Sequence, residues 1–210
     1  MSNYVTAIGL DVHARSIKAC ALNPMTGEVE RASFGYDPAS VAEWALGFES
    51  PKAVYESGVT GFHLCRALRA LGLDCAVGAF SKMQRPAADR GRKTDRRDAE
   101  FLARLLATRN VVEVWVPDGR TEAARDLSRA LADARDDLQR AKQRMSKFLL
   151  RHGHVFDEPT PTGGRRGNWT RAYWRWADAI EFVEPDDAAA YEHYRDCVRR
   201  CEEARDALAR

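Results

Sequence analysis

The alternation of hydrophobic and polar positions divides the chain into a strand-rich first part and a helical second part. Short segments with β-branched or alternating apolar residues predict strands at 5–11, 16–22, 28–36, 52–56, 74–80 and 112–116. Helical spacing and start signals predict helices at 37–48, 60–70, 92–108, 121–151 and 170–183, and again from 186 onward. The first three strands are joined by turns too short for a helical crossover, so they form an antiparallel meander.

The later strands alternate with helices, which indicates that they pair in parallel on the same sheet. The predicted fold class is therefore α/β, with a ribonuclease H-like mixed sheet and flanking helices. We expect four parts: a domain at 1–118 built on the mixed sheet, a long coiled-coil helix at 119–153, a linker at 154–168 and a helical segment at 169–210 that continues the coiled coil.

The helix predicted at 92–108 has acidic residues on its apolar side. Asp95, Asp98, Leu102 and Leu106 recur at steps of three and four, so the two carboxylates share a face with the core. Arg97, Glu100 and Arg104 take the opposite, solvated face. Capping explains acidity in a first turn but not its alignment with buried residues. Two carboxylates in this position favour a bound cation.

Two further acidic residues end predicted strands. Asp11 follows the apolar strand at 5–11 and Glu56 ends the strand at 52–56. Each alone is explained as the first exposed residue after a strand, but strand ends are also where side chains converge on a shared site. Four carboxylates over a mixed sheet suit two Mg²⁺ or Mn²⁺ ions that activate and stabilise the oxygens of a phosphodiester.

Apolar residues of the long helix repeat at steps of four and three, as in a coiled coil: Leu127, Leu131, Ala134, Leu138, Ala141, Met145 and Phe148. A stripe this narrow needs a partner helix, which is either a later segment of this chain or a second copy. The last helix has a similar repeat, and no capping residue stops it before Arg210. We therefore expect the parent protein to continue beyond this chain.

Composition narrows the class of protein only slightly. Lys and Arg total 33 against 31 Asp and Glu, a net charge of +2, so the overall charge does not identify a partner. Five cysteines without a repeated CxxC spacing favour a reducing compartment over a disulfide framework. No uncharged apolar run is long enough to cross a bilayer, and we expect a cytoplasmic protein.

Basic residues gather around the helix at 92–108, on the last turns of the long helix, and among the tryptophans that follow it. We expect these side chains to contact a nucleic-acid backbone: Lys82, Arg85, Arg90, Arg92, Lys93, Arg96, Arg97, Arg140, Arg144, Lys147, Arg151, Arg165, Arg166, Arg171 and Arg175. Trp169, Tyr173 and Trp176 either stack on unpaired bases or pack against the long helix, and the sequence leaves both interpretations open.

The chain resembles the DEDD-type insertion-sequence transposases in three segments, which occur in order before a long coiled-coil helix: Ile8-Gly9-Leu10-Asp11-Val12-His13, Tyr55-Glu56-Ser57-Gly58-Val59-Thr60-Gly61 and Lys93-Thr94-Asp95-Arg96-Arg97-Asp98-Ala99. The resemblance covers residues 4–153, the N-terminal half of such proteins. Members of this family are bridge-RNA-guided DNA recombinases, and their N-terminal domain is similar to the Holliday-junction resolvase RuvC.

The resemblance implies that Asp11, Glu56, Asp95 and Asp98 form the DEDD tetrad, which binds Mg²⁺, or Mn²⁺ as a substitute, beside the DNA strand to be cut. It also implies three partners: DNA, a structured guide RNA, and further copies of the chain in a dimer or tetramer. Family members carry a nucleophilic serine in a second, C-terminal domain that nothing here matches. We expect this chain to fold and bind metal, but not to recombine DNA alone.

Three other classes fit parts of the pattern. A resolvase-like nuclease would cut branched DNA with the tetrad alone, without RNA. A sugar-kinase or actin-like ATPase also begins with a strand ending in Asp, but its phosphate-binding turn needs a glycine that Val12-His13 does not supply. A non-catalytic module that dimerises through the coiled coil and binds nucleic acid is the third.

Overall fold

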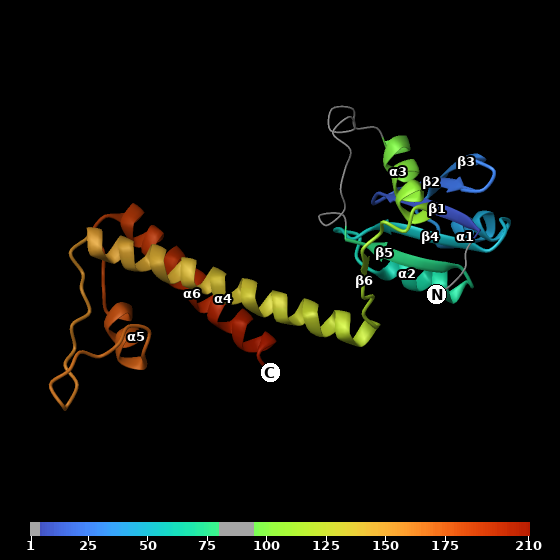
Figure 1. The fold of residues 1–210 in the computed structure, drawn as a ribbon. Coiled ribbons are helices and arrows are strands. Elements are labelled where there is room, and N and C mark those ends of the chain that lie inside the picture. The colour runs from blue at the N-terminus through green and yellow to red at the C-terminus, as the bar shows by residue number, and fades with distance from the viewer. Residues whose placement is uncertain (1–4, 80–94) are drawn as a thin grey trace. The chain divides into compact units, whose positions relative to one another are not determined.

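The computed structural model describes residues 5–79 and 95–210; within the second range, side chains are described from residue 98 onward. The chain divides into two compact units, Met1–Asp118 and Gly119–Arg210, and each is described by itself. Figure 1 shows the elements of both units coloured along the chain. In the described residues, none of the helices combines the length and the apolar composition that a membrane crossing requires.

The first unit is built on a six-stranded sheet with the order β3-β2-β1-β4-β5-β6. Its strands are β1 (Thr6–Val12), β2 (Ser16–Leu22), β3 (Val29–Gly35), β4 (Pro51–Glu56), β5 (Asp74–Gly78) and β6 (Glu113–Val114). β1, β2 and β3 form an antiparallel meander, whereas β1, β4 and β5 pair in parallel. The predicted mixed sheet is therefore confirmed, and it fits a ribonuclease H-like fold.

Helices cover both faces of this sheet (Figure 1). α1 (Pro38–Leu46) and α2 (His63–Ala70) bury their apolar residues against one face, together with Ile8 and Leu10 of β1. α3 (Asp95–Ala107) packs on the other face, where Leu102 and Leu106 are buried with Ala7. The prediction that Leu102 and Leu106 face the core is confirmed.

α2 begins at His63, three residues later than the sequence pattern predicted. The intervening loop is held by Tyr55, whose hydroxyl donates a hydrogen bond to the Gly61 carbonyl at 2.9 Å and accepts one from the Cys65 amide at 3.3 Å. Gly61 has a φ of 64°, a left-handed conformation that favours glycine. These contacts fix the loop that directly follows Glu56.

The second unit contains α4 (Gly119–Arg151), α5 (Arg171–Asp178) and α6 (Pro185–Leu208). α6 packs along α4 within the same chain, and Figure 1 shows the two helices side by side. Met145 and Val198 are buried in their shared core, and Lys142 pairs with Glu202 at 2.9 Å. Towards the start of α4, Leu127 of the predicted seam is 52% exposed. Pairing within the chain therefore covers the later part of the predicted seam.

The helix predicted to reach residue 183 ends at Asp178, so this boundary was wrong. Beyond the helix, Phe182 packs against Phe148 and Tyr191, with ring centroids 5.3 Å and 5.0 Å apart. Apolar residues continue past the end of the helix because Ile180 and Phe182 also pack in the core of the second unit, although they are not helical.

Met145→Ala is expected to lower the free energy of unfolding of the second unit by about 2–5 kcal/mol, because the fully buried side chain leaves a cavity between α4 and α6. Leu150→Ala, on the same helix but 65% exposed, is the control and should change stability by about 0.5 kcal/mol or less. Urea unfolding followed by tryptophan fluorescence measures both, and equal midpoints for the two variants would contradict the prediction.

Candidate metal centre and nucleic-acid interface

Asp11 and Glu56 occupy neighbouring positions near the carboxyl ends of β1 and β4. The two strands pair in parallel with Leu10 beside Tyr55, and the acidic residues follow directly after this pair. Leu10 and Tyr55 point into the core under α1 and α2. Side chains alternate between the faces of a sheet, so Asp11 and Glu56 point to the face that α3 covers.

α3 approaches β1 so closely that a side chain at position 9 has no room. A Cβ atom on Gly9 would lie 2.0 Å from the Ala99 carbonyl oxygen and 2.5 Å from the Ala103 backbone nitrogen. Further along the helix, Leu106 packs in the same cluster as Ala7. α3 therefore runs antiparallel to β1, and its first turn lies towards the carboxyl end of the strand, where Asp11 is.

That first turn carries Asp95 and Asp98. Asp98 is half-buried and precedes Ala99, the residue against Gly9; the side chain of Asp95 lies outside the described residues. Among the side chains that the structure describes, no three His, Cys, Asp or Glu residues form a cluster arranged for a metal ion. The backbone thus places Asp11, Glu56 and Asp98 at one edge and on one face of the sheet, which we call the acidic edge.

The Asp11 carboxylate has a histidine beside it. His13 Nε2 lies 3.0 Å from Asp11 Oδ2, and the side chain of Asp11 is only 18% exposed. A histidine in contact with a carboxylate oxygen fixes the orientation of that carboxylate, as groups behind metal ligands commonly do. The donors of the acidic edge are carboxylate oxygens, which suit Mg²⁺ or Mn²⁺ better than Zn²⁺. Asp11, Glu56 and Asp98 could hold such an ion.

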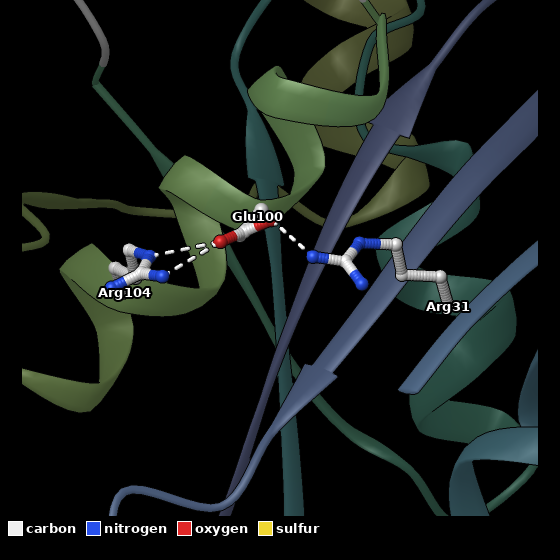
Figure 2. A network of polar contacts seen from close by, with 3 residues as sticks. All are labelled: Arg31, Glu100 and Arg104. Atoms are coloured by element: carbon white, nitrogen blue, oxygen red, sulfur yellow. Dashed lines mark hydrogen bonds and ion pairs between the residues drawn. The ribbon is translucent and has the colours of Figure 1, made fainter. Parts of the chain in front are cut away.

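Glu100 of α3 contacts two arginines: Arg31, which links the helix to the edge strand β3, and Arg104, one turn further along α3 (Figure 2). Its Oε2 accepts a hydrogen bond from Arg31 Nη2 at 2.5 Å, and its Oε1 accepts one from Arg104 Nη2 at 2.7 Å. The hydrogen bond from Arg31 is the main cause that lowers the pKa of Glu100, and the hydrogen bond from Arg104 is the second. Glu100 is less solvated than predicted, because Arg31 of β3 reaches over it and leaves its side chain 22% exposed.

Glu100→Gln should lower the free energy of unfolding by about 1 kcal/mol at pH 7, because it removes a carboxylate shared by two partly exposed arginines. The folded-state pKa of Glu100 is depressed, so its stabilisation is present above the ordinary carboxyl range and is lost as pH falls through the folded-state value. Urea unfolding should therefore separate variant and wild type at neutral pH but not in strong acid. Glu43→Gln, at an exposed position of α1, is the control; a pH-independent loss for Glu100→Gln would contradict the assignment.

The structure describes only part of the predicted nucleic-acid interface. Lys82, Arg85, Arg90, Arg92 and Lys93 lie outside the described residues, as do the side chains of Arg96 and Arg97. On α4 four exposed residues recur at steps of four, three and four, and so share one stripe of the helix: Arg140, Arg144, Lys147 and Arg151. We call these residues the basic stripe.

The arginines after α4 are also at the surface. Arg165 pairs with Asp157 at 2.9 Å and Arg166 with Glu158 at 3.0 Å, whereas Arg171 and Arg175 are exposed on α5.

The aromatic residues of this segment pack inside the second unit. Tyr173 is 2% exposed, and its ring lies 4.7 Å from that of Trp169 and 5.3 Å from that of Trp176. The Lys142 ammonium group of α4 lies 5.0 Å from the centre of the Trp169 ring. Of the two interpretations that the sequence left open, the structure supports packing against the long helix.

A six-stranded mixed sheet with this strand order and with helices on both faces fits the ribonuclease H-like class. A family model described as a transposase, of the DEDD type found in IS110 elements, matches residues 8–153. The chain belongs to this IS110-type transposase family.

Two relatives agree with this assignment. The putative transposase y4qE of Sinorhizobium fredii (strain NBRC 101917 / NGR234) is 40% identical over 159 residues, which cover 76% of this chain and 38% of that protein. The transposase for insertion sequence element IS1533 of Leptospira borgpetersenii is 30% identical over 202 residues, 93% of this chain and 56% of that protein. The chain thus spans about half or less of the length of these relatives.

Proposed function

We propose that this chain is the N-terminal part of an insertion-sequence transposase that cuts and exchanges DNA strands with bound Mg²⁺, guided by a structured RNA. The metal ligands are Asp11, Glu56, Asp95 and Asp98. The observation that carries the proposal is the parallel register of β1 and β4, which sets Asp11 beside Glu56 on the face crossed by the acidic turn of α3.

The chemistry of the acidic edge supports a metal-dependent reaction on phosphodiesters. Carboxylates close to one another repel, and a divalent cation offsets that repulsion while offering positive charge to a phosphate. Mg²⁺ bound there would activate the attacking oxygen and stabilise the leaving oxygen. The protein side chains would hold the ion, and His13 would keep the Asp11 carboxylate in one orientation.

Partners follow from the basic residues and the helices. A guide RNA selects DNA by base pairing, so the protein needs contacts to the backbone more than to the bases. The basic stripe on α4 supplies exposed cations for such contacts, and with Arg165, Arg166, Arg171 and Arg175 it forms the proposed RNA surface. The half-exposed seam around Leu127 is the proposed contact between copies of the chain in a dimer or tetramer.

A labelled four-way DNA junction distinguishes this proposal from the resolvase-like alternative. We expect the chain to bind the junction more tightly in Mg²⁺ than in EDTA, without strand exchange, because family members place their nucleophilic serine in a second domain. Glu56→Gln should remove the effect of Mg²⁺. Cutting of the junction by this chain without RNA would favour the resolvase-like nuclease. An equal affinity for the junction in Mg²⁺ and in EDTA would contradict the proposal, and so would strand exchange by this chain.

A further inference from the structure

Lys18 lies on the strand beside Asp11 and on the same face of the sheet. β1 and β2 pair antiparallel, with Asp11 directly opposite Lys18. Residues in this relation have Cβ atoms about 5 Å apart and side chains on one face. Cys20, two positions further along β2, is buried with Ala99 and Ala103 of α3, which confirms that this face is the one α3 covers. The Lys18 ammonium group therefore adjoins the acidic edge.

Two residues of β3 extend this surface. The register of β2 and β3 sets Ser33 beside Lys18 and Arg31 beside Cys20. Lys18 Nζ donates a hydrogen bond to Ser33 Oγ at 2.5 Å. Lys18, Arg31 and Ser33 line a hollow of about 280 Å³, together with Ala19, Ala32 and Ala99. Because Ala99 follows Asp98 in the first turns of α3, the hollow opens next to the acidic edge.

The hollow carries positive charge, whereas the adjacent acidic edge carries negative charge. The Ser33 hydroxyl is neutral, so its hydrogen bond orients the Lys18 ammonium group without cancelling the charge. Arg31 shares Glu100 with Arg104, so this one carboxylate serves two guanidinium groups (Figure 2). A net positive hollow thus borders a negative edge. The hollow therefore offers two cationic side chains to an anionic group beside a ligand bound at the acidic edge.

We propose that Lys18, Ser33 and Arg31 bind a backbone phosphate of the DNA strand, next to the phosphodiester that lies at the acidic edge. Ammonium and guanidinium groups form short, charge-assisted hydrogen bonds to phosphate oxygens, and a serine hydroxyl adds a further donor. Such contacts carry no sequence information, which fits DNA selected by base pairing to RNA. The inference rests on the proposed function, since it takes the strand at the acidic edge to be DNA.

The test is the salt dependence of binding to a fluorescein-labelled single-stranded DNA, measured by anisotropy. Each phosphate contact contributes about 0.7 to the slope of log affinity against log salt for a single strand. Lys18→Gln should therefore reduce the slope by about 0.7 and lower the affinity by about tenfold at low salt. Lys18→Arg should keep the wild-type slope. Ser33→Ala should weaken binding about twofold to threefold with the slope unchanged, because no charge is lost.

Arg109→Gln is the charge-matched control. Arg109 is exposed just beyond the C-terminal end of α3, the end away from Asp98, and it should leave the slope unchanged. Equal slopes for Lys18→Gln and Arg109→Gln would overturn the inference, and so would a reduced slope for Lys18→Arg.

Repeating the measurement in EDTA and in Mg²⁺ separates the two proposals. The proposed function fails if wild-type binding is the same in both buffers, whereas the effect of Lys18→Gln on the slope is read in either. Asp11→Asn should remove the Mg²⁺ effect and keep the contribution of Lys18. Loss of the Mg²⁺ effect in Asp11→Asn, together with an unchanged slope in Lys18→Gln, would overturn the inference alone.

Discussion

Asp11→Asn is expected to lower the affinity of the chain for Mn²⁺ by about 100-fold. Substituting a residue that only supports a metal ligand typically lowers metal affinity about 10-fold to 100-fold. Asp11 is proposed as a direct ligand, so its substitution belongs at the upper end of this range. The substitution keeps the size of the side chain and removes its charge. Titration followed by electron paramagnetic resonance measures bound Mn²⁺, and anomalous scattering from a Mn²⁺-soaked crystal locates it.

Asp74→Asn is the matched control for this experiment. Asp74 begins β5, whereas the acidic edge lies at the carboxyl ends of the parallel strands, so the same chemical change falls at the opposite edge of the sheet. It should leave Mn²⁺ affinity unchanged. Thermal unfolding of Asp11→Asn without metal, measured alongside, shows whether the variant is folded. Wild-type Mn²⁺ affinity in a folded Asp11→Asn variant would contradict the metal assignment.

Gly9→Ala is expected to lower the free energy of unfolding of the first unit by about 3 kcal/mol or more, which corresponds to a fall in melting temperature of about 10 °C or more. The new Cβ atom would lie 2.0 Å from the Ala99 carbonyl oxygen and 2.9 Å from the Leu102 Cβ. The first of these is a backbone atom, so no side-chain rotation relieves the overlap. α3 must move away from β1, which also displaces Asp98 from the acidic edge.

Gly35→Ala makes the same substitution in the same sheet without the overlap. A Cβ atom on Gly35 would meet nothing within 4 Å, so its effect on stability should stay within about 0.5 kcal/mol. Thermal unfolding followed by circular dichroism compares the two variants. Mn²⁺ affinity should fall in any folded Gly9→Ala protein, since the helix that carries Asp98 has shifted. Similar melting temperatures for the two variants would show that α3 does not pack on β1 as described.

The sequence was sufficient to predict the order of strands and helices in the first unit, because periodicity reports which residues face a core. Its limits lie in contacts between distant segments. The stripe of Leu102 and Leu106 showed which side of α3 is buried, but not that its backbone lies against Gly9. Glu100 was expected in solvent because its partner, Arg31, is 69 positions away in the chain. The residues next to Glu100 in the sequence do not predict the contact with Arg31.

The candidate site shows the same division. Strand ends and helical spacing predicted the acidic residues, and the parallel register of β1 and β4 then set Asp11 beside Glu56. The pairing of Lys18 with Asp11 depends on the register of the antiparallel strands β1 and β2. A shift of one residue in that register would have placed Lys18 on the other face of the sheet. The sequence also did not decide the role of Trp169, Tyr173 and Trp176, because stacking on bases and packing against α4 require the same residue types.

The two outer strands of the sheet bear on how the protein behaves at high concentration. An outer strand exposes unpaired backbone groups that can recruit a strand from another molecule and start aggregation. β6 contains only two residues, Glu113–Val114, and β3 carries the charged residues Glu30 and Arg31. Short or charged outer strands are poor templates for such growth. Strand addition from other molecules is thereby discouraged at both outer strands of the sheet, so the domain can reach a high concentration without polymerising strand to strand.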